Sequence, residues 1–435
     1  MRATAELRRR ILNRTARIAV IGQGYVGLSL ACAAADAGFR VIGVDVDPHR
    51  IAELADGRAA VAGVDEDAVK RAFASELLRF STSADAVAES HLVFVCVPTP
   101  LRDGTPDLTH IERACQEVAA RLEPGSFVAL ESTTYPGTTD ELVRPLLETS
   151  GLLAGRDFLL AYSPERIDPG NEEYAFRQVP RIVGGMNPES TGVAVLFYEQ
   201  LVDKVMAVSS CRAAELAKLL ENTFRHVNIA LVNEIAMVCH EVEIDVWEVI
   251  AAAATKPFGF MPFYPGPGVG GHCIPLDPGY LAWQVRRDVG HQLRVLEEAE
   301  DINAQMPAWV TDRIAEALND RGRAVKDAKI LVLGVAYKPD VADVRESPAV
   351  KVINLLHRRG ALLAFNDPYV EEVALNGGTL RRTDLTNTAV ARADLVAVLT
   401  AHSAYDLEWV ADHAKLVFDT RNAYNGNRRA NVIRL

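Results

Sequence analysis

The stretch Arg17-Ile-Ala-Val-Ile-Gly-Gln-Gly-Tyr-Val-Gly27 decides the fold of the amino-terminal part of the chain. An apolar, partly β-branched run leads directly into a loop of the form G-x-G-x-x-G. An Ala-rich segment, Leu28–Ala37, and a second apolar run, Arg40–Val44, come next. This order predicts a strand, a helix and a second strand, which together form a βαβ unit.

The glycine loop predicts a dinucleotide site. Gly22 permits the tight turn, Gly24 lets backbone N–H groups approach a pyrophosphate, and Gly27 lets the helix and the strand pack closely. Tyr25 and Val26 lie between the last two glycines, just before the predicted helix, whose N-terminus would face the phosphates. A glycine turn without a ligand is the alternative interpretation.

An acidic residue supports the choice of cofactor. Asp45 closes the second predicted strand 18 residues after Gly27, where a carboxylate binds the adenosine ribose hydroxyls. We therefore predict NAD in preference to NADP. Arg50 lies close enough in sequence to complicate that choice, because a nearby arginine can accommodate a 2′-phosphate.

The alternation of strands and helices continues along the chain. We expect strands at 92–97 and 127–131 and helices at 108–121 and 139–149. Strands that alternate with helices imply a mostly parallel, doubly wound sheet.

Ligands of such sheets bind at the carboxyl ends of the strands, where Pro98, Thr99 and Thr133 would lie. Simple turn formation is an equal alternative for each threonine.

The middle of the chain has a different character. Residues 213–242 show one helical pattern without Gly or Pro, and Ala-rich sequence continues to residue 254. A loop dense in Gly and Pro follows at 257–279, and a further helical pattern covers 291–319. We predict a helical block that joins two lobes and offers a surface for self-association.

The opening pattern then recurs. Lys329–Gly334 is a strand that ends in glycine, 347–359 is a predicted helix, and the strand at 361–365 runs into Asn-Asp-Pro. This weak internal repeat predicts a second Rossmann-like lobe. Its glycine loop is replaced by Ala336-Tyr-Lys-Pro339, so we expect a ligand other than a dinucleotide bound in the standard way.

The predicted fold class is therefore α/β, with two Rossmann-like doubly wound domains joined by a helical central domain. The predicted boundaries are 1–212 for the NAD-binding domain, 213–320 for the central domain and 321–435 for the carboxyl-terminal domain. The length of 435 residues fits three domains at about 150 residues each.

Composition excludes several classes of protein. Hydrophobic residues make up 49% and charged residues 24% of the chain, which argues against collagen-like, coiled-coil and disordered proteins. The net charge of −12 argues against a nucleic-acid or anionic-membrane binder, although a local basic pocket for one phosphorylated ligand stays possible. No apolar run is long enough to span a membrane.

Cysteine usage indicates a reducing compartment, and we expect a cytoplasmic protein without a metal site. The six cysteines show no C-x-x-C spacing and lie at positions 32, 96, 115, 211, 239 and 273.

The segment Pro267-Gly-Val-Gly-Gly-His-Cys-Ile-Pro-Leu-Asp277 carries the strongest chemical signal. Glycines such as Gly270 allow a close approach of backbone and substrate, so Cys273 is a candidate nucleophile and a structural thiol is the alternative. Asp277, four residues later, can orient water or stabilise a cation. His272 is expected to form local hydrogen bonds, because neighbouring side chains of an extended segment point apart.

Three further polar residues have weaker signals. Lys218 and Asn222 are four residues apart on the long predicted helix and so share a face. On spacing alone, a solvated pair is the simpler interpretation. Glu165 lies in Ser163-Pro-Glu-Arg166, a predicted turn.

Taken together, these segments resemble the UDP-glucose/GDP-mannose dehydrogenase family over nearly the whole chain. Eight motifs appear in the family's order: GQGYVGL from 22, VPTP at 97–100, STTYPGTT at 132–139, SPER at 163–166, KLLEN at 218–222, GPGVGGHCIPLDP at 266–278, GVAYKPDVADVRES at 334–347 and DTRN at 419–422. The resemblance implies an enzyme that oxidises C6 of a nucleotide-linked hexose from alcohol to carboxylate with two molecules of NAD and a cysteine.

The resemblance also implies catalytic roles. Cys273 would capture the aldehyde as a thiohemiacetal, and the second hydride transfer would leave a thioester. Lys218, Asn222 and a water held by Asp277 would stabilise the oxyanion and move protons, with Thr133 beside that water. Glu165 would be the base for thioester hydrolysis.

Binding roles follow in the same way. Arg345 would reach the cofactor, while Lys338 and Arg421 would hold the UDP part of the substrate from the second lobe. The segment at 258–264, with Phe263 and Tyr264, would cover the sugar nucleotide. Lys256 would reach the site of a neighbouring subunit, and the long helix makes a homodimer or a higher assembly of dimers the default expectation.

The substrate is predicted from two segments. Residues 163–171 and 256–264 resemble the branch that acts on UDP-N-acetylglucosamine. At position 169, where the UDP-glucose branch has an acidic residue, this chain has Pro169. We therefore favour UDP-N-acetylglucosamine, then UDP-N-acetylmannosamine, then UDP-glucose. Two rival hypotheses are an inactive sugar-nucleotide-binding protein and a two-electron hydroxyacid dehydrogenase that needs no cysteine.

Overall fold

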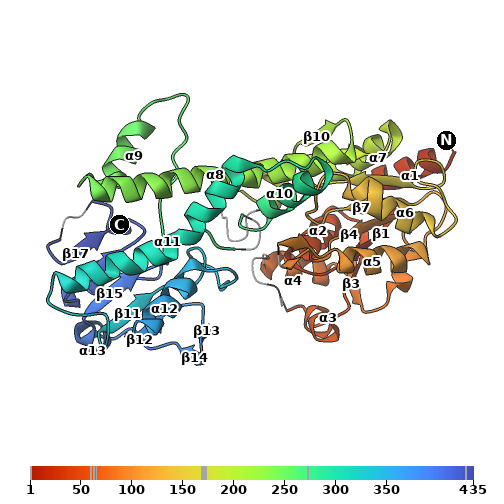
Figure 1. Ribbon diagram of the computed structural model, residues 1–435. Helices are drawn as coiled ribbons and strands as arrows, with labels where there is room; N and C mark the ends of the chain where they lie inside the picture. Colours follow the sequence, from red (N-terminus) through yellow and green to blue (C-terminus); the bar gives the residue numbers. More distant parts are fainter. Residues whose placement is uncertain are drawn as a thin grey trace. The chain divides into compact units, whose positions relative to one another are not determined.

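The computed structural model describes residues 2–58, 61, 64, 66–102, 104–167, 174–271, 274–426 and 429–435. The chain forms two compact units. Unit 1 consists of Met1–Glu221 and Gly279–Gly290, and unit 2 consists of Asn222–Pro278 and His291–Leu435. Each unit contains one parallel or mostly parallel sheet (Figure 1). The three predicted domain boundaries stay a prediction.

The sheet of unit 1 has eight strands in the order β10-β9-β8-β7-β4-β1-β2-β3. Neighbouring strands are parallel except β8 and β9, which are antiparallel. The chain therefore leaves β1 first toward β2 and later toward β4, and this creates the topological switch point of a doubly wound sheet. The strands are β1 (Arg17–Ile21), β2 (Arg40–Val44), β3 (Leu78–Ser81), β4 (Leu92–Val95), β7 (Phe127–Leu130), β8 (Leu159–Tyr162), β9 (Arg181–Gly185) and β10 (Val205–Val208).

Helices cover both faces of this sheet (Figure 1). Along β1, Ile18 and Val20 join one buried cluster, whereas Ala19 and Ile21 join another, as the alternation of side chains in a strand requires. The helices of unit 1 are α1 (Arg2–Leu12), α2 (Tyr25–Asp36), α3 (Pro48–Ala55), α4 (Glu66–Ala74), α5 (Thr109–Ala119), α6 (Arg144–Glu148) and α7 (Pro188–Tyr198), with short turns at η1 (Ala84–Val87), η2 (Thr139–Val143) and η3 (Phe176–Gln178). A small ribbon pairs β5 (Leu101–Arg102) with β6 (Thr105–Pro106).

Unit 2 contains a five-stranded parallel sheet in the order β12-β11-β15-β16-β17. Its switch point lies between β11 and β15, so the two Rossmann-like sheets repeat one topology. The strands are β11 (Lys329–Leu333), β12 (Leu362–Asn366), β15 (Leu395–Val398), β16 (Val417–Asp419) and β17 (Val432–Arg434), and β13 (Glu372–Leu375) pairs separately with β14 (Gly378–Arg381).

The longest helix, α8 (Cys211–Glu241), contributes its first residues to unit 1 and the rest to unit 2. The helices that begin in unit 2 are α9 (Val246–Ala254), α10 (Asp277–Asp288), α11 (Arg294–Asn319), α12 (Pro348–Arg358), α13 (Asn387–Arg392) and α14 (Leu407–His413). Most of α10 belongs to unit 1.

Some predicted boundaries were wrong. Helix α2 begins at Tyr25, three residues earlier than predicted, because Gly24 already has the extended conformation of a helix cap. The helix predicted at 139–149 is a π-helical turn followed by the short α6. Helix α10 begins at Asp277, inside the segment predicted as a loop.

In the described part of the chain, no helix is long and apolar enough to cross a membrane.

Candidate active site

The glycine loop after β1 has the shape that a dinucleotide needs. Gly22 has a φ of +92°, and a Cβ on it would lie 2.6 Å from the carbonyl oxygen of Cys96. A Cβ on Gly27 would lie 1.9 Å from the carbonyl oxygen of Gly22. A Cβ on Gly24 would meet nothing within 4 Å. The first and third glycines are therefore required by packing, while the second leaves open space for a phosphate.

The N-terminus of α2 supplies donors for that phosphate. Tyr25 and Val26 belong to the first turn of the helix, and Gly24 is its N-cap without a side-chain cap hydrogen bond. The first N–H groups of a helix have no intrahelical partner, and the helix dipole favours an anion there. This end of α2 thus fits the pyrophosphate of NAD.

The predicted ribose acid lies beside this loop. Oδ2 of Asp45 accepts from the backbone N–H of Gln23 at 2.7 Å and from Nη1 of Arg50 at 2.9 Å. Oδ1 accepts from the N–H of Asp47 at 3.0 Å. Because Arg50 is paired with the carboxylate, a 2′-phosphate at this place would meet a negative charge. The arrangement favours a ribose diol and hence NAD.

The loops after β4 and β7 are joined by hydrogen bonds. The hydroxyl of Thr99 donates to the carbonyl oxygen of Thr133 at 2.9 Å, and that of Ser132 donates to the carbonyl oxygen of Val97 at 2.8 Å. Pro98 is exposed at the same edge. The structure therefore brings the three residues predicted at the strand ends together.

Glu165 follows β8, the next strand of the sheet, and is buried. Its Oε1 accepts from the backbone N–H groups of Arg166 and Ile167 at 2.6 and 2.7 Å. Nη2 of Arg181 lies 2.5 Å from Oε2, and Nη1 of the same guanidinium lies 3.2 Å from Glu131. The carboxylate of Glu165 is thus fixed in orientation.

The sequence analysis assigned no role to Glu131 or Arg181. Burial raises the pKa of Glu131 to about 7; the charge of Arg181 and the hydroxyl of Tyr198 oppose this shift, and the charge of Glu165 adds to it. Both residues adjoin apolar strands, and a charged residue beside such a run was the one available signal.

Lys218 is buried on α8. Three residues earlier, the buried Glu215 accepts hydrogen bonds from the N–H of Gly137 at 2.6 Å and from the N–H and hydroxyl of Thr139 at 2.9 and 2.7 Å. Glu215 therefore ties the first turns of α8 to the loop after β7. Sequence reasoning assigned no role to Glu215, because its partners lie more than 70 residues away.

In unit 2, Nδ2 of Asn222 donates to Oδ2 of Asp277, and both side chains are buried. Asp277 is the first residue of α10. Two residues that are distant in sequence and were predicted to act together are therefore in contact.

The predicted nucleophile Cys273 and its neighbour His272 lie outside the described residues. The five described cysteines are free thiols and all are buried. Burial raises the pKa of Cys115 to about 12 and also raises the pKa of Cys96 and Cys211. Since the thiolate is the nucleophile, these buried thiols are poorly suited to attack a substrate.

The glycine loop before Cys273 packs on the loop after β11. Gly271 has a φ of +88°, and its N–H donates to the carbonyl oxygen of Arg345 at 3.0 Å. A Cβ on Gly270 would lie 2.8 Å from atoms of Tyr337 and Pro348. Close packing against protein atoms therefore accounts for these glycines, a reason that differs from the predicted approach of substrate.

Arg421 lies at the end of β16 and packs against Gly266, where a Cβ would lie 2.5 Å from its Nη1. Its Nε donates to the carbonyl oxygen of Leu399 at 2.9 Å, and burial lowers its pKa to about 10. Lys338 is half-buried, with Nζ 5.9 Å from the ring centre of Tyr337. Both cations are thus held near the carboxyl edge of the second sheet.

Arg345 is 60% exposed and forms an ion pair with Asp343. It belongs to unit 2, whereas the glycine loop of the cofactor site belongs to unit 1.

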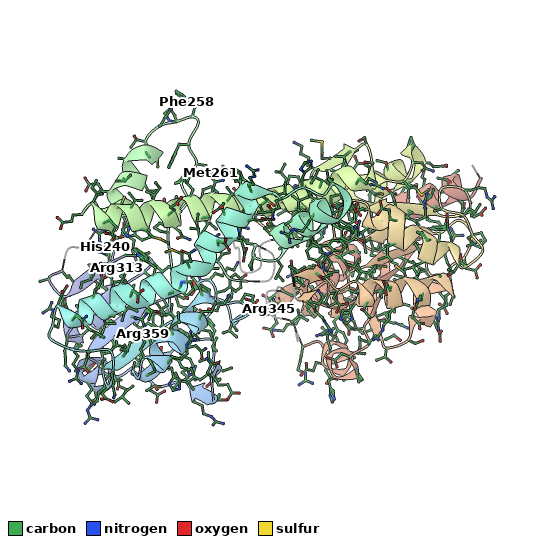
Figure 2. The ribbon with its side chains drawn as sticks, in the orientation of Figure 1. His240, Phe258, Met261, Arg313, Arg345 and Arg359 are labelled. Carbon is green, nitrogen blue, oxygen red and sulfur yellow. The ribbon has the colours of Figure 1, made fainter. Side chains whose placement is uncertain are left out.

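The segment after α9 carries exposed aromatic residues. The ring of Tyr264 stacks on that of Trp247 with centres 6.2 Å apart, and Phe263 is half-buried. Nζ of Lys256 lies 5.0 Å from the ring centre of Phe258. Figure 2 shows Phe258 at the outer end of this segment.

Comparison with known proteins identifies the family. The NAD-binding domain of the UDP-glucose/GDP-mannose dehydrogenase family matches residues 16–202, its central domain matches 212–305, and its UDP-binding domain matches 331–426.

Two relatives and one solved structure extend this match. The chain is 34% identical over 412 residues to the UDP-N-acetyl-D-mannosamine dehydrogenase of Pyrococcus horikoshii. This match covers 93% of this chain and 95% of that protein. It is also 34% identical over 426 residues to the NDP-N-acetyl-D-galactosaminuronic acid dehydrogenase of Ralstonia solanacearum, with 95% and 97% covered. The structure of the UDP-D-ManNAc dehydrogenase of Pyrococcus horikoshii superposes with a TM-score of 0.87 at 32% identity over 96% of this chain and 98% of that one.

These findings confirm the predicted α/β fold class, the NAD cofactor and a UDP-sugar as the substrate class. The chain belongs to the UDP-glucose/GDP-mannose dehydrogenase family and is an NAD-dependent nucleotide-sugar dehydrogenase.

Proposed function

We propose that this enzyme oxidises C6 of a UDP-N-acetylhexosamine twice, from alcohol to carboxylate, through a thioester on Cys273. The observation that carries the proposal is the contact between Asn222 and Asp277 in the segment that follows Cys273, while the five other thiols are buried. We further propose three domains at 1–212, 213–320 and 321–435, which agree in order with the three matched family domains.

In the first oxidation, O6 passes its proton to the water held by Asp277 as an oxyanion develops, and Lys218 and Asn222 donate hydrogen bonds to that oxygen. NAD, held by the glycine loop and Asp45, would supply the hydride acceptor for both oxidations. The anchoring of α8 by Glu215 supports this role, because it fixes the helix that carries Lys218.

In the second part of the reaction, the thiolate of Cys273 adds to the aldehyde carbon, and the thiohemiacetal so formed is oxidised to a thioester. A water then attacks the thioester carbon, the carbon–sulfur bond breaks, and the acid is released with the thiol restored. We propose that Glu165 takes the proton of this water and that Asp277 and Thr133 help to hold it. The fixed orientation of Glu165 supports its role.

The UDP part of the substrate is assigned to Lys338 and Arg421 of the second sheet, beneath Phe263 and Tyr264. Gly270 lies beside it, and Lys256 extends toward the site of a second subunit. Arg345 is assigned to the cofactor. The half-buried guanidinium of Arg421, which donates to the carbonyl oxygen of Leu399, suits an anionic ligand, because it is partly desolvated and positively charged.

The identity of the hexose is tested by NADH release from a panel of UDP-N-acetylglucosamine, UDP-N-acetylmannosamine, UDP-N-acetylgalactosamine, UDP-glucose and GDP-mannose. Residues 163–171 favour UDP-N-acetylglucosamine, whereas the names of several relatives favour UDP-N-acetylmannosamine as the second candidate. We expect turnover of an N-acetylhexosamine well above that of UDP-glucose. Faster turnover of UDP-glucose would overturn the substrate class, and no turnover of any sugar would favour an inactive binding protein.

We also propose a homodimer that buries an apolar stripe on α8. Large hydrophobic side chains are exposed along this helix and directly after its end. They follow one another at intervals of three, four or seven residues: Leu220, Phe224, Leu231, Ile235, Val238 and Val242. Such a stripe matches the periodicity of a helix that packs against a partner. A cytoplasmic location is proposed as well, and the free thiols of the described cysteines support it.

A further inference from the structure

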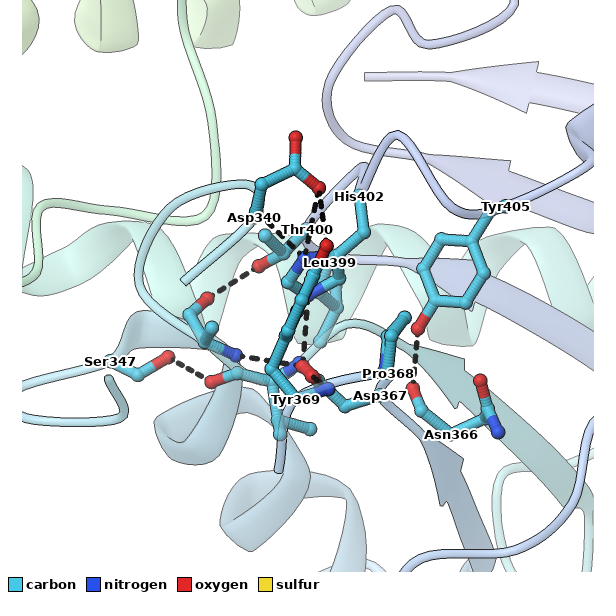
Figure 3. Close-up of polar contacts among 12 residues, drawn as sticks. Asp340, Ser347, Asn366, Asp367, Pro368, Tyr369, Leu399, Thr400, His402 and Tyr405 are labelled. Atoms are coloured by element: carbon cyan, nitrogen blue, oxygen red, sulfur yellow. Dashed lines mark hydrogen bonds and ion pairs between the residues drawn. The ribbon is translucent and has the colours of Figure 1, made fainter. Parts of the chain in front are cut away.

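A buried pair of side chains, Asp367 and His402, lies at the switch point of the second sheet. Asp367 follows β12, and His402 follows β15, which is the neighbour of β11 on its other side. Figure 3 shows the polar contacts around this pair. Nucleotides bind at such switch points in doubly wound sheets, so groups that shape the loops here act on the ligand site.

Asp367 is the counterpart of Asp45 in the first sheet, and its carboxylate likewise accepts from the backbone of the loop after the first strand. Oδ2 accepts from the backbone N–H groups of Val335 and Ala336 at 2.8 and 3.2 Å, and it lies 2.9 Å from Nε2 of His402. The side chain has no exposed surface. Asp367 differs from Asp45 in its partner, which is the buried His402 and not an arginine.

The charge of Asp367 is stabilised by these contacts. Burial raises the pKa of its carboxyl group, but the hydrogen bonds from His402 and from the backbone N–H groups of Val335 and Tyr369 outweigh burial, and the pKa lies below its ordinary value.

His402 links this anchor to a second point of the loop. Its Nδ1 accepts from the backbone N–H of Asp340 at 2.9 Å, so this nitrogen carries no hydrogen. Nε2 therefore carries the hydrogen and donates it to the carboxylate of Asp367. One imidazole thus spans from Asp367 to the backbone at position 340.

The backbone at position 340 needs such support. Asp340 has a φ of +60°, a conformation that non-glycine residues keep only when their surroundings hold it. Besides His402, the N–H of Ser403 donates to Oδ1 of Asp340 at 2.9 Å. Lys338 lies between the two anchored points, Ala336 and Asp340.

We propose that His402 is a positioning residue of the UDP site: by accepting a hydrogen bond from the backbone N–H of Asp340, it fixes the course of the loop at 336–340 and thereby the place of Lys338. This inference rests on the proposed function, in which Lys338 holds the UDP part of the substrate. His402 itself does not touch the ligand in this scheme.

Two conservative variants separate the two halves of the bridge. His402→Asn keeps an acceptor at the position of Nδ1 and can still hold Asp340, whereas His402→Gln keeps a donor at the position of Nε2 and can hold only Asp367. We expect His402→Gln to raise the Kd for UDP about tenfold, the effect of one lost hydrogen bond, and His402→Asn to leave it within about twofold of the parent. Titration calorimetry with UDP measures both.

A merely structural role makes the opposite prediction, because loss of the contact to Asp367 would then matter most and binding would follow thermal stability. The Tm and the Kd for NAD are measured for each variant as well. We expect that neither changes in parallel with the Kd for UDP. Tyr405→Phe is the matched control, since it removes a hydroxyl that donates to the carbonyl oxygen of Asn366 in the same region and forms no hydrogen bond with Asp340 or Asp367 in the described structure. It is expected to bind UDP like the parent.

Lys338→Ala distinguishes the two levels of the argument. Unchanged UDP binding in Lys338→Ala would overturn the assignment of Lys338 in the proposed function. Weakened binding in Lys338→Ala together with normal binding in His402→Gln would overturn the positioning role. Equal weakening in His402→Gln and His402→Asn would overturn it too.

Discussion

At the scale of single residues, Arg181 serves two buried carboxylates at once. Its guanidinium contacts Glu131 and Glu165 and lies over the ring of Tyr198, 5.4 Å from its centre. One cation cannot neutralise two carboxylates, and burial makes the excess negative charge costly. Burial raises the pKa of Glu131 to about 7, and the charge of Glu165 adds to this shift while that of Arg181 opposes it.

Replacement of Glu131 by Gln tests this charge balance. In the folded protein the pKa of Glu131 lies at about 7, against 4.5 as the ordinary value. The folded state therefore binds the proton more tightly, and the resulting stability is present below pH 4.5 and is lost as the pH rises through 7. Glu131→Gln lacks this dependence, so the free energy of unfolding of the parent should fall relative to the variant by at most about 1.4 kcal/mol per pH unit in this window.

Urea unfolding of both proteins between pH 5 and pH 8 provides the measurement. A difference between parent and variant that does not change with pH would show that Glu131 titrates at its ordinary value.

The pair of Asp45 and Arg50 should control the choice between NAD and NADP. Asp45→Asn removes the negative charge that faces a 2′-phosphate and releases Arg50 from its ion pair. We expect the ratio of kcat/KM for NADP to that for NAD to rise about tenfold or more, since a charge-assisted contact is gained. Steady-state kinetics with both cofactors measure this ratio.

Asp47→Asn is the matched control for Asp45→Asn. Asp47 accepts hydrogen bonds from the N–H groups of His49 and Arg50 as the cap of α3 and has no contact with the guanidinium in the described structure. The control makes the same change of charge two residues away. An equal rise in both variants would mean that net charge, and not the contact of Asp45, sets the preference.

At the scale of elements, α8 carries both the residues proposed for catalysis and the stripe proposed for assembly. Its buried face carries Lys218 and Asn222, and its exposed face carries the apolar stripe. The segment after α9 carries two further exposed hydrophobic side chains, Phe258 and Met261, which Figure 2 labels. One helix thus holds the proposed active site and the proposed dimer contact together.

Leu231→Glu tests the proposed contact, because a carboxylate in a buried apolar interface is costly to desolvate. We expect light scattering at micromolar concentration to show a parent of twice 47.4 kDa and a variant of 47.4 kDa. Leu12→Glu on α1 makes the same substitution at a similarly exposed leucine outside the stripe and should stay dimeric. A monomeric parent contradicts the dimer, and a dimeric Leu231→Glu contradicts this choice of interface.

Most elements of the two sheets follow from local sequence, because buried parallel strands are apolar runs and the helices between them are Ala-rich or amphipathic. Helix α10 could not be predicted in this way. It begins with Asp277-Pro-Gly279, residues typical of a loop, and the proline is tolerated because it lies in the first turn. The antiparallel direction of β9 could not be predicted either, since the direction of a strand in a sheet depends on partners that are distant in sequence.

The same reason limits the site. The glycine loop, Asp45, Thr99, Thr133 and the pair of Asn222 and Asp277 were predicted from motifs, and the structure places them at strand ends or in contact. The residues that hold the others in place had no local signal, because each has a partner that lies 35 to 78 residues away in sequence. These residues are Glu131, Arg181, Glu215, Asp367 and His402.

At the scale of the whole molecule, the two units divide the work of binding. Unit 1 contains the glycine loop and Asp45, and unit 2 contains Lys338, Arg421 and the bridge formed by His402. The net charge of −12 does not oppose an anionic substrate, because a few cations fixed at the second sheet act locally and more distant charges are screened.

Hydrogen exchange can show this division directly. Binding slows amide exchange where it orders backbone N–H groups. NAD alone should therefore protect residues 22–27 and 45–50, and UDP alone should protect 335–346. Uridine, which lacks the phosphates, should give little protection and serves as the control. Protection of residues 22–27 by UDP would contradict the assignment of the two ligands to different units.

The most direct test of the central claim, a four-electron oxidation through Cys273, is the number of NADH molecules formed per limiting UDP-N-acetylhexosamine. We predict two NADH and one carboxylate per sugar for the parent, because the thiohemiacetal keeps the aldehyde bound between the oxidations. Cys273→Ala should form no acid. One NADH per sugar in the parent, or acid formation by Cys273→Ala at the parental rate, would contradict the claim.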